Sequence, residues 1–464
     1  MTQTSSMSSM SQGSVTRLLL KYSVPAALGL VANALYNIVD RLFIGQYIGS
    51  DALGAVSLTY PLTLFMIAVG SLVGVGGASQ ISRFLGEGHH RKAEHVVGSA
   101  VTVITLLSAL FTAGGLLCLD GLIGALGASV HLAPPTRVYT SIILWGLPFN
   151  LLGFSLNYLI RAEGAPRWAM GTMMIGAGMN VFLDWLFIVR LSMGVAGAAL
   201  GTAVAQIAAF LWVALFYLGR RGRLRISALT LNPDVEIVKE MLLIGASPFL
   251  MELFYSVSMM LYNNVVWRHG GDLAISAMGI FFCLDNLIYI PVFGIGEGLQ
   301  PIVGYNYGAQ NSDRVKKTVI CATVLSTAYF ILSFVCTEIW TRSMVVLFAG
   351  GKESLVQLAV RAMRIGYLGM PFAAAGIIAS NAFLAIGKPG ISLFLNFCRQ
   401  ELLFLPALLF MPQIMGLDGA WGSFIVVDAG GGLLGAALLA WYWSLFDGEG
   451  HDTLDMSAES AFDK

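Results

Sequence analysis

Four polar residues in an otherwise apolar stretch are spaced so that they could hold a proton or a cation. Asn33, Tyr36, Asn37 and Asp40 fall at positions i, i+3, i+4 and i+7, which places them on one face of an α-helix. A carboxylate surrounded by amide and hydroxyl oxygens can bind a proton or a hard cation. Because a charge inside a bilayer is costly, this face should point into a helix bundle.

A second carboxylate lies in a similar setting. Asn180 and Asp184 are four residues apart, and so are Thr202 and Gln206, so each pair stacks on its own helix. At about 1.5 Å per residue, Asp40, Asp184 and Thr202 lie roughly 10 Å below the same membrane surface. The sequence therefore predicts one site in the outer part of the amino-terminal bundle. Its expected cation ligands are Asp40, Asn180, Asp184 and Thr202, and its expected supporting polar residues are Asn33, Tyr36, Asn37, Asn157 and Gln206.

Two carboxylates in one confined site repel each other by about 4 kcal/mol at roughly 4 Å and an effective dielectric near 20. A proton or a sodium ion would relieve that repulsion, and the sequence does not choose between them. The alternative is structural: Asp40 pairs with Arg41, or the polar groups only hold helices together. Adjacent residues on a helix do not face each other well, and such a pair leaves Asp184 unexplained.

The carboxyl-terminal half carries a different set of polar residues. Asn263 stands where Asp40 is expected to repeat, and an apolar run, LLFLPALLF, replaces the surroundings of Asp184. Glu252 and Asp285 could neutralise a cationic substrate, or could equally form a buried hydrogen-bonded network with Arg399 and Glu401. Asp428 and Glu338 lack a clear polar stripe. The expected substrate cavity is lined by Glu252, Tyr255, Asp285, Tyr289, Met173 and Met259.

Composition indicates the setting in which these residues act. Hydrophobic residues make up 57% of the 464 residues and charged residues only 11%, whereas charged residues form about a quarter of soluble proteins. The formal net charge is zero, so nothing suggests a nucleic-acid partner. The five cysteines show no paired spacing, which argues against a disulfide framework or a zinc site. The partner expected from composition is the lipid bilayer.

Apolar stretches of about twenty residues or more are each long enough to cross a bilayer. The alternate connections between them hold fourteen Lys and Arg residues on one side and seven on the other. The richer side is expected to be cytoplasmic, which predicts a multi-pass protein of the inner membrane with both termini in the cytoplasm. The twelve expected spans are 17 to 47, 55 to 82, 95 to 118, 135 to 160, 167 to 190, 196 to 219, 240 to 267, 274 to 304, 317 to 341, 358 to 385, 389 to 413 and 419 to 446.

The two halves of the chain match each other at a nearly constant offset. Gly86 corresponds to Gly308 at an offset of 222 residues, and Pro25 corresponds to Pro248 at 223. Repeats of six spans each should be related by an axis along the membrane normal. We therefore expect an all-α membrane protein of two pseudo-symmetric six-helix bundles. Its expected segments are a tail (1–16), the first bundle (17–219), a cytoplasmic linker (220–239), the second bundle (240–446) and a tail (447–464).

Proline in the first span is expected to affect the motion of its helix. Pro25 lies on the same predicted helix as Asp40, and a proline inside a span frees a backbone carbonyl and kinks the helix. We treat Pro25 as a candidate hinge.

Several motifs resemble the multidrug and toxic compound extrusion (MATE) family over essentially the whole chain. They are GEGLQPIVGYNYGAQ at 296–310, RAEGAPRWAM at 161–170, and the Pro-Phe pairs at 148 and 371. The chain looks closer to the DinF-like and MepA-like branches than to NorM, because its tenth span has no acidic residue. That departure puts a cation site on the tenth helix in doubt.

The resemblance implies an antiporter that exports small organic, often cationic, compounds in exchange for sodium ions or protons. In this family the cation-site residues match Asp40, Asn180, Asp184 and Thr202. No cofactor besides the coupling ion is expected, and we expect a monomer. An alternative is a flippase for a lipid-linked or lipid-like substrate. An enzyme is not expected, because no HExxH, GxSxG or P-loop motif occurs in the sequence.

Overall fold

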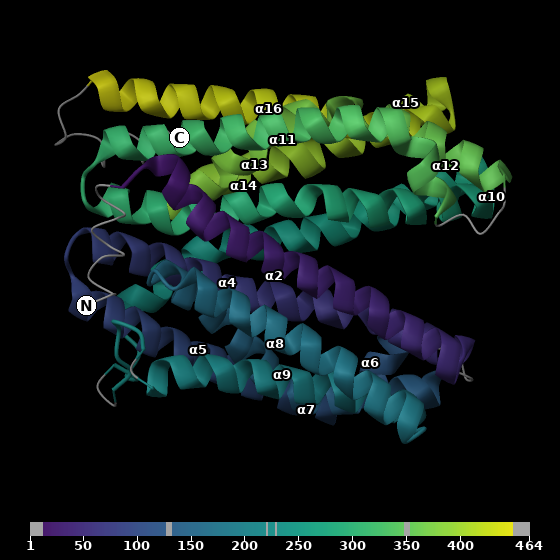
Figure 1. The fold of residues 1–464 in the computed structure, drawn as a ribbon, viewed down its shortest axis with the longest axis horizontal. Coiled ribbons are helices and arrows are strands. Elements are labelled where there is room, and N and C mark those ends of the chain that lie inside the picture. Colours follow the sequence, from purple (N-terminus) through teal and green to yellow (C-terminus); the bar gives the residue numbers. More distant parts are fainter. Residues whose placement is uncertain (1–12, 127–131, 220, 228–229, 348–352, 449–464) are drawn as a thin grey trace.

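The protein forms two helical lobes that lie side by side (Figure 1). The structure is a computed structural model that describes residues 13–126, 132–219, 221–227, 230–347 and 353–448, and every regular element in those ranges is helical. Together with the solved structures compared below, this confirms the predicted all-α fold of two bundles. The end of the molecule at which α2 begins and α16 ends is called the terminal side.

The first lobe holds the elements up to residue 218. They are α2 (Val15–Phe43), η1 (Ile44–Ile48), α3 (Ser50–Leu58), α4 (Tyr60–Gly86), α5 (His90–Leu117), α6 (Leu119–Ala125), α7 (Ala133–Ala162), α8 (Pro166–Asp184), η2 (Trp185–Arg190) and α9 (Gly194–Leu218). Both η1 and η2 are π-helical, a wider winding that is frequent at functional sites. Asp40 comes four residues before η1, and Asp184 comes directly before η2.

The second lobe begins at Val235, and its first element is a hairpin of two helical arms. Within α10 (Val235–Gly308), Gly271 adopts φ 61° and ψ −159° and separates residues 235–270 from 272–308. Glycine tolerates this positive φ without strain. The lobe continues with α11 (Ser312–Val346), α12 (Glu353–Gly366), η3 (Tyr367–Gly369), α13 (Met370–Ala385), α14 (Pro389–Phe397), η4 (Cys398–Phe404), α15 (Leu405–Met415) and α16 (Leu417–Gly448).

Eleven helical segments of the described residues are long and apolar enough to span a membrane, whereas the sequence predicted twelve. The remaining predicted span, 240 to 267, is helical as the first arm of α10 but is not one of the eleven. Glu252, Asn263 and Asn264 interrupt the apolar run of this arm. By length and composition, the described residues therefore contain eleven candidate membrane spans.

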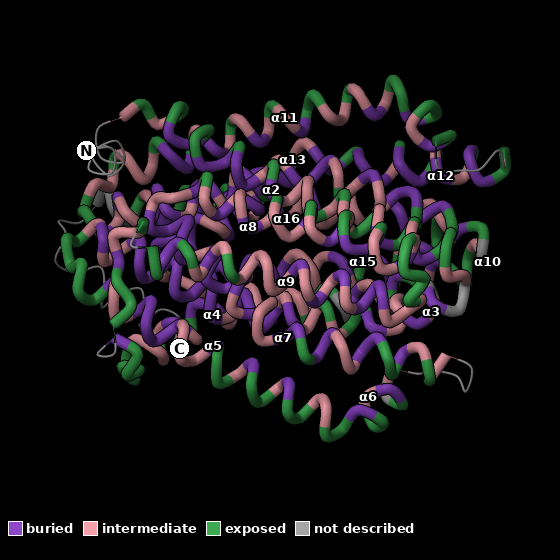
Figure 2. Tube along the Cα trace, turned by 60° about the horizontal axis from the view of Figure 1, so that its bottom comes forward, coloured by how far each residue is buried: buried purple, intermediate pink, exposed green. Residues whose placement is uncertain are grey.

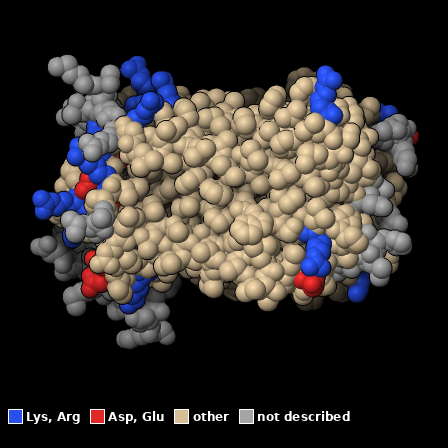
Figure 3. Space-filling view, turned by 90° about the horizontal axis from the view of Figure 1, so that it is seen from below, with Lys and Arg blue, Asp and Glu red and all other residues tan. Residues whose placement is uncertain are grey.

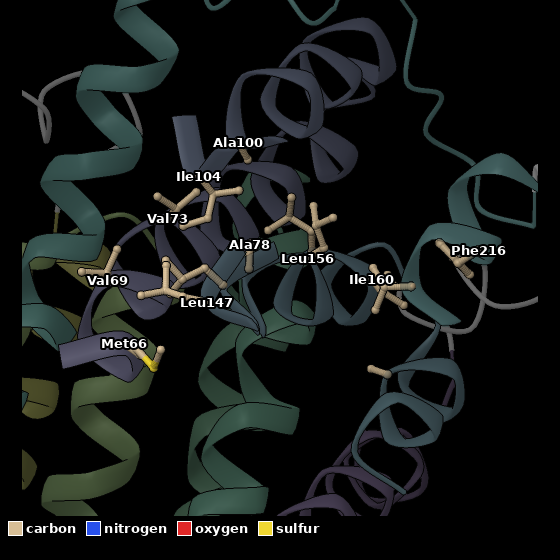
Figure 4. Packing of buried hydrophobic residues seen from close by; sticks show 14 of the residues in the cluster. Met66, Val69, Val73, Ala78, Ala100, Ile104, Leu147, Leu156, Ile160 and Phe216 are labelled. Atoms are coloured by element: carbon tan, nitrogen blue, oxygen red, sulfur yellow. The ribbon is translucent and has the colours of Figure 1, made fainter. Parts of the chain in front are cut away.

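Hydrophobic side chains hold the first lobe together. Val69 and Val73 of α4, Ile104 of α5, and Leu147 and Leu156 of α7 are buried in one cluster (Figure 4). Buried residues concentrate between the helices, whereas the peripheral α11 and α6 show many exposed ones (Figure 2). The middle of the face in Figure 3 shows almost no charged side chains, which gather toward the two ends. A face with so few charges suits a lipid environment.

Helix α2 contacts both lobes. Its first turns pack Leu18 and Tyr22 against Leu299 of α10 in the second lobe, and its last turns carry Asp40 into the first lobe. Pro25 is buried inside the helix between these two parts. The candidate hinge therefore lies where α2 passes from one lobe to the other.

The lobes meet at the terminal side through glycines that the internal repeat relates. A Cβ at Gly86 would overlap the carbonyl oxygen of Tyr305, and a Cβ at Gly308 would overlap that of Arg83. Gly86 and Gly308 are 222 residues apart in sequence, and so are Arg83 and Tyr305. The internal repeat of the sequence thus appears in the structure as two equivalent helix crossings. At each crossing the two backbones can approach this closely only because glycine has no side chain.

Candidate functional site

A pocket lined by both polar and apolar side chains lies in the first lobe, between α2, α7, α8 and α9. Each helix contributes side chains because its polar positions recur on the inward face while apolar positions face the lobe core or the exterior. The lining includes two predicted cation ligands and four predicted supporting residues. These are Asn180, Thr202, Asn33, Tyr36, Asn157 and Gln206.

The carboxyl groups of Asp40 and Asp184 lie within hydrogen-bonding range of each other. Asp184 is fully buried and Asp40 is 8% exposed. No N–H or other O–H group of the described residues donates to Asp40 Oδ1 or to either carboxyl oxygen of Asp184. Two buried acceptors that face each other need a shared proton or a cation between them, because two bare carboxylates would repel.

Arg41 does not take the role that the structural alternative gave it. Its guanidinium lies over the ring of Tyr60, 5.8 Å from the centroid. Asp40 instead faces Asp184. The two carboxylates therefore form a pair, whereas Arg41 is exposed and lies over Tyr60.

Helix α9 packs closely against the carboxylate of Asp184. The Asn180 amide donates to Thr202 Oγ1 at 3.3 Å, which joins α8 to α9. A Cβ on Gly201 would lie 2.5 Å from Asp184 Oδ1. Glycine at this position thus leaves the space that the carboxylate occupies.

The structure adds Tyr139 of α7 to the site. Its side chain is 8% exposed and lies close to Thr202, Asp40 and Asp184. The sequence analysis missed it because a single tyrosine near the end of a predicted span forms no stripe. Its depth, similar to that of Asp40, was the available signal.

Two predicted supporting residues differ in what they do. Asn37 is exposed, and its amide donates to the backbone oxygen of Asn33, one turn earlier on the same helix, at 2.8 Å, so it bonds within α2 and does not line the pocket. Asn157 lines the pocket, and its amide donates to the Ala169 oxygen at 2.7 Å. Its Oδ1 accepts from Arg161 Nη2 at 3.1 Å.

The acidic residues of the second lobe form a network that the sequence only partly indicated. Tyr289 donates to Asp428 Oδ2 at 2.9 Å, Arg399 Nη2 lies 4.0 Å from Asp428 Oδ1, and Asp285 lies near Asp428. Asp428, which shows no polar stripe in the sequence, is thus the centre of this network. Of the two residues that the buried-network alternative named as partners, Arg399 lies beside Asp428, whereas Glu401 accepts from Ser258 Oγ at 3.3 Å.

The remaining residues of the expected substrate cavity are distributed over both lobes. Met173 lines the pocket of the first lobe, whereas Met259 packs against the core of the second lobe. Glu252 and Tyr255 lie on the first arm of α10, where Tyr255 is 43% exposed. The structure therefore does not bring the two methionines to one cavity, because they belong to different bundles.

Comparison with known proteins relates the chain to one family. The sequence model of the MatE family matches residues 25–186 and 248–408, one match in each half. The multidrug export protein MepA of Staphylococcus aureus strain MRSA252 is 27% identical over 421 residues, covering 89% of this chain and 91% of MepA. MepA of Staphylococcus haemolyticus is 27% identical over 417 residues, covering 90% and 91%.

Solved structures share the fold. A crystal structure of a MATE protein in complex with MaL6 superimposes with a TM-score of 0.91 at 23% identity, covering 95% of this chain and 99% of the other. An outward-facing multidrug resistance MATE transporter gives 0.89 at 23% identity, covering 94% and 98%. The family match falls on both six-helix halves of the chain. The chain therefore belongs to the MATE family of membrane transporters.

Proposed function

We propose that this protein is an antiporter that exports organic cations and is driven by inward movement of protons or sodium ions. The observation that carries the proposal is the pair of buried carboxyl groups, Asp40 and Asp184, which face each other without a donor from the described residues. Such a pair binds one positive charge readily and releases it when its surroundings change.

Oxygen acceptors around the pair suit either ion. Asn180 Oδ1 and Gln206 Oε1 also accept no hydrogen bond from the described residues, and Thr202 adds a hydroxyl. Sodium needs several oxygen ligands, whereas a proton needs only the carboxyl pair. Both ions thus use the same carboxylates, and imposed gradients distinguish them.

Two features support export of organic compounds. The relatives described above are named multidrug export proteins. The described residues of this chain also place acidic and aromatic side chains on the first arm of α10, Glu252 and Tyr255, where a cationic aromatic compound finds charge neutralisation and a stacking surface.

Alternating access is supported by the contact surface between the two lobes at the terminal side, which we call the seam. At the terminal side two ion pairs cross it, Arg83 with Glu240 and Arg161 with Glu297. Opening that side requires the breaking of these pairs and of the glycine crossings. In the proposed orientation the terminal side is cytoplasmic, because the connections there are rich in Lys and Arg.

The test is transport by the purified chain in proteoliposomes. A cationic dye is loaded, and a sodium gradient and a proton gradient are imposed separately at zero membrane potential. The proposal predicts that one of these gradients, imposed in the inward direction, accelerates dye efflux, and that the opposite gradient does not. Equal efflux under every gradient would exclude ion coupling.

A further inference from the structure

Arg161 occupies the point at which the pocket of the first lobe reaches the seam between the lobes. It lies in the last turn of α7 and is only 4% exposed. Its Nη1 pairs with Glu297 Oε2 of α10, on the other lobe. The side chains of this pair are 5% and 15% exposed, whereas those of the other seam pair, Arg83 and Glu240, are 17% and 42% exposed.

The same guanidinium is bound to the pocket. Arg161 Nη2 donates to Asn157 Oδ1 at 3.1 Å, and its charge lies over the ring of Tyr158, 5.3 Å from the centroid. Asn157 lines the pocket together with Asn180 and Thr202. A continuous series of polar contacts therefore runs from the pocket through Asn157 and Arg161 to Glu297.

The side-chain amide of Asn157 can hydrogen-bond only a few partners at once. Its Nδ2 is held by the carbonyl of Ala169 on α8, so its Oδ1 is the atom left to accept from Arg161. A cation or donor that enters the pocket competes for this oxygen. Because a buried guanidinium is costly without its acceptors, a change at Asn157 alters how firmly Arg161 can hold Glu297.

We propose that Asn157, Arg161 and Glu297 form a relay that couples occupancy of the first-lobe pocket to opening of the seam at the terminal side. Arg161 is a positioning residue in this relay, since it reaches the pocket only through Asn157. The inference rests on the proposed function, because it takes the pocket, which Asn180 and Thr202 line, to respond to the ion bound at Asp40 and Asp184. A spatial series of contacts does not by itself demonstrate coupling, so the test measures coupling directly.

The experiment follows the distance across the terminal side of the full-length protein. His90 and Lys317 are exposed on the first and second lobes, and both are replaced by cysteine in a variant lacking the five native cysteines. Spin labels at these positions report the distance at pH 8 without sodium, at pH 8 with saturating sodium, and at pH 6 without sodium. The proposal predicts that one cation shifts the distance in the otherwise unaltered protein.

Relay variants should lose that shift. In the Asn157→Ala variant and in the Arg161→Gln variant the cation should no longer change the distance. The variant that carries both of these changes should lose no more of the shift than either single variant, because both changes interrupt one relay. Because Arg161→Gln leaves Glu297 buried and unpaired, it can misfold. The pair Arg161→Gln with Glu297→Gln removes both charges and should fold while still lacking the shift.

The other seam pair supplies the matched control. Arg83→Gln and Glu240→Gln weaken the seam without contact to the pocket lining, so they should alter the resting distance and keep the cation-dependent shift. A full shift in Asn157→Ala and in the Arg161→Gln, Glu297→Gln double variant overturns the relay. If gradient-driven efflux by the unaltered protein persists in that case, the proposed function stands and only the relay fails. If no cation changes the distance in the unaltered protein, the relay is likewise refuted.

Discussion

The carboxyl groups of Asp40 and Asp184 lie within hydrogen-bonding range of each other although they are 144 residues apart in sequence. Asp40 lies four residues before the π-helical η1, and Asp184 lies directly before the π-helical η2, so both helices widen just beyond the carboxylates. One positive charge shared by the pair is the simplest state compatible with this arrangement.

Gly201→Ala should impair transport without unfolding the protein. The new methyl group would lie 2.5 Å from Asp184 Oδ1, so the carboxylate must leave its position, which disturbs its pairing with Asp40. We expect the ion concentration that gives half-maximal efflux to rise about tenfold, equivalent to about 1.4 kcal/mol. Gly178→Ala on α8 is the matched control, because no heavy atom outside its own helix backbone and chain neighbours lies within 4 Å of its Cβ position. Equal ion dependence in both variants would contradict the close contact.

Tyr139→Phe should weaken ion binding by removing one hydroxyl beside Thr202 and the carboxyl pair. Its partner is the neutral Thr202, and a hydrogen bond between neutral groups contributes about 0.5 to 1.5 kcal/mol, so the half-maximal ion concentration should rise by roughly two- to tenfold. Efflux titrated against sodium and against pH measures the change. An unaltered titration curve would show that this hydroxyl has no part in the site.

Glu163 should make stability depend on pH at the terminal side. It follows α7 outside the spans, and its Oε1 accepts from the backbone N–H groups of Arg223 and Leu224 in the segment between the lobes. Burial raises the pKa of Glu163 from its ordinary 4.5 to about 7, and the negative charge of Glu94 adds to this rise. The two backbone hydrogen bonds and the positive charge of Arg223 act in the opposite direction but are outweighed. The folded chain thus holds this proton more tightly than the unfolded chain does.

The contribution of the Glu163 carboxyl group to the free energy of unfolding is therefore fully present below about pH 4.5 and is lost as the pH rises through about 7. The loss is about 3 kcal/mol at most. Glu163→Gln keeps an oxygen acceptor and has no charge to bury, so its melting temperature should match the unaltered protein near pH 5 and exceed it at pH 8. Thermal unfolding in detergent across this range measures the difference. A constant difference at every pH would show that Glu163 does not titrate there.

Gly86→Ala and Gly308→Ala should each force the lobes apart at the terminal side, because each new Cβ overlaps a carbonyl oxygen of the other lobe. The two variants should act alike, since the repeat relates the two crossings. Labelling of cysteines introduced beside the seam should become faster in both. Gly390→Ala is the control, since no neighbouring atom lies within 4 Å of its Cβ position; faster labelling in it as well would argue against a specific seam effect.

Sequence reasoning found those parts of the site that depend on helical spacing and depth. Asn180 and Thr202 reach one pocket because each repeats a polar position at the same membrane level. Tyr139 forms no stripe and only its depth indicates it, and the Arg161–Glu297 pair is indicated by neither spacing nor depth. A lone tyrosine carries no periodicity, and an arginine beside a loop reads as an ordinary cytoplasmic charge until the packing of two lobes gives it a partner.

Methionine positions illustrate a second limit of the sequence. Met173 and Met259 are chemically alike, but the bundle to which each belongs decides which cavity it reaches. Asp428 shows the reverse case, because its importance depends on Tyr289 and Arg399 from other helices. Tertiary packing alone brings such residues together.

The most direct measurement is gradient-driven dye efflux by the Asp40→Asn, Asp184→Asn double variant in proteoliposomes. Asp120→Asn serves as the control, because that carboxylate is exposed and pairs with Arg137 away from the pocket. Asparagine keeps the size of each side chain and removes the shared charge. We predict that the double variant folds and inserts normally, loses the acceleration by the ion gradient, and that the control keeps it. Gradient-driven efflux by the double variant at the rate of the unaltered protein would contradict the assignment of the coupling site to Asp40 and Asp184.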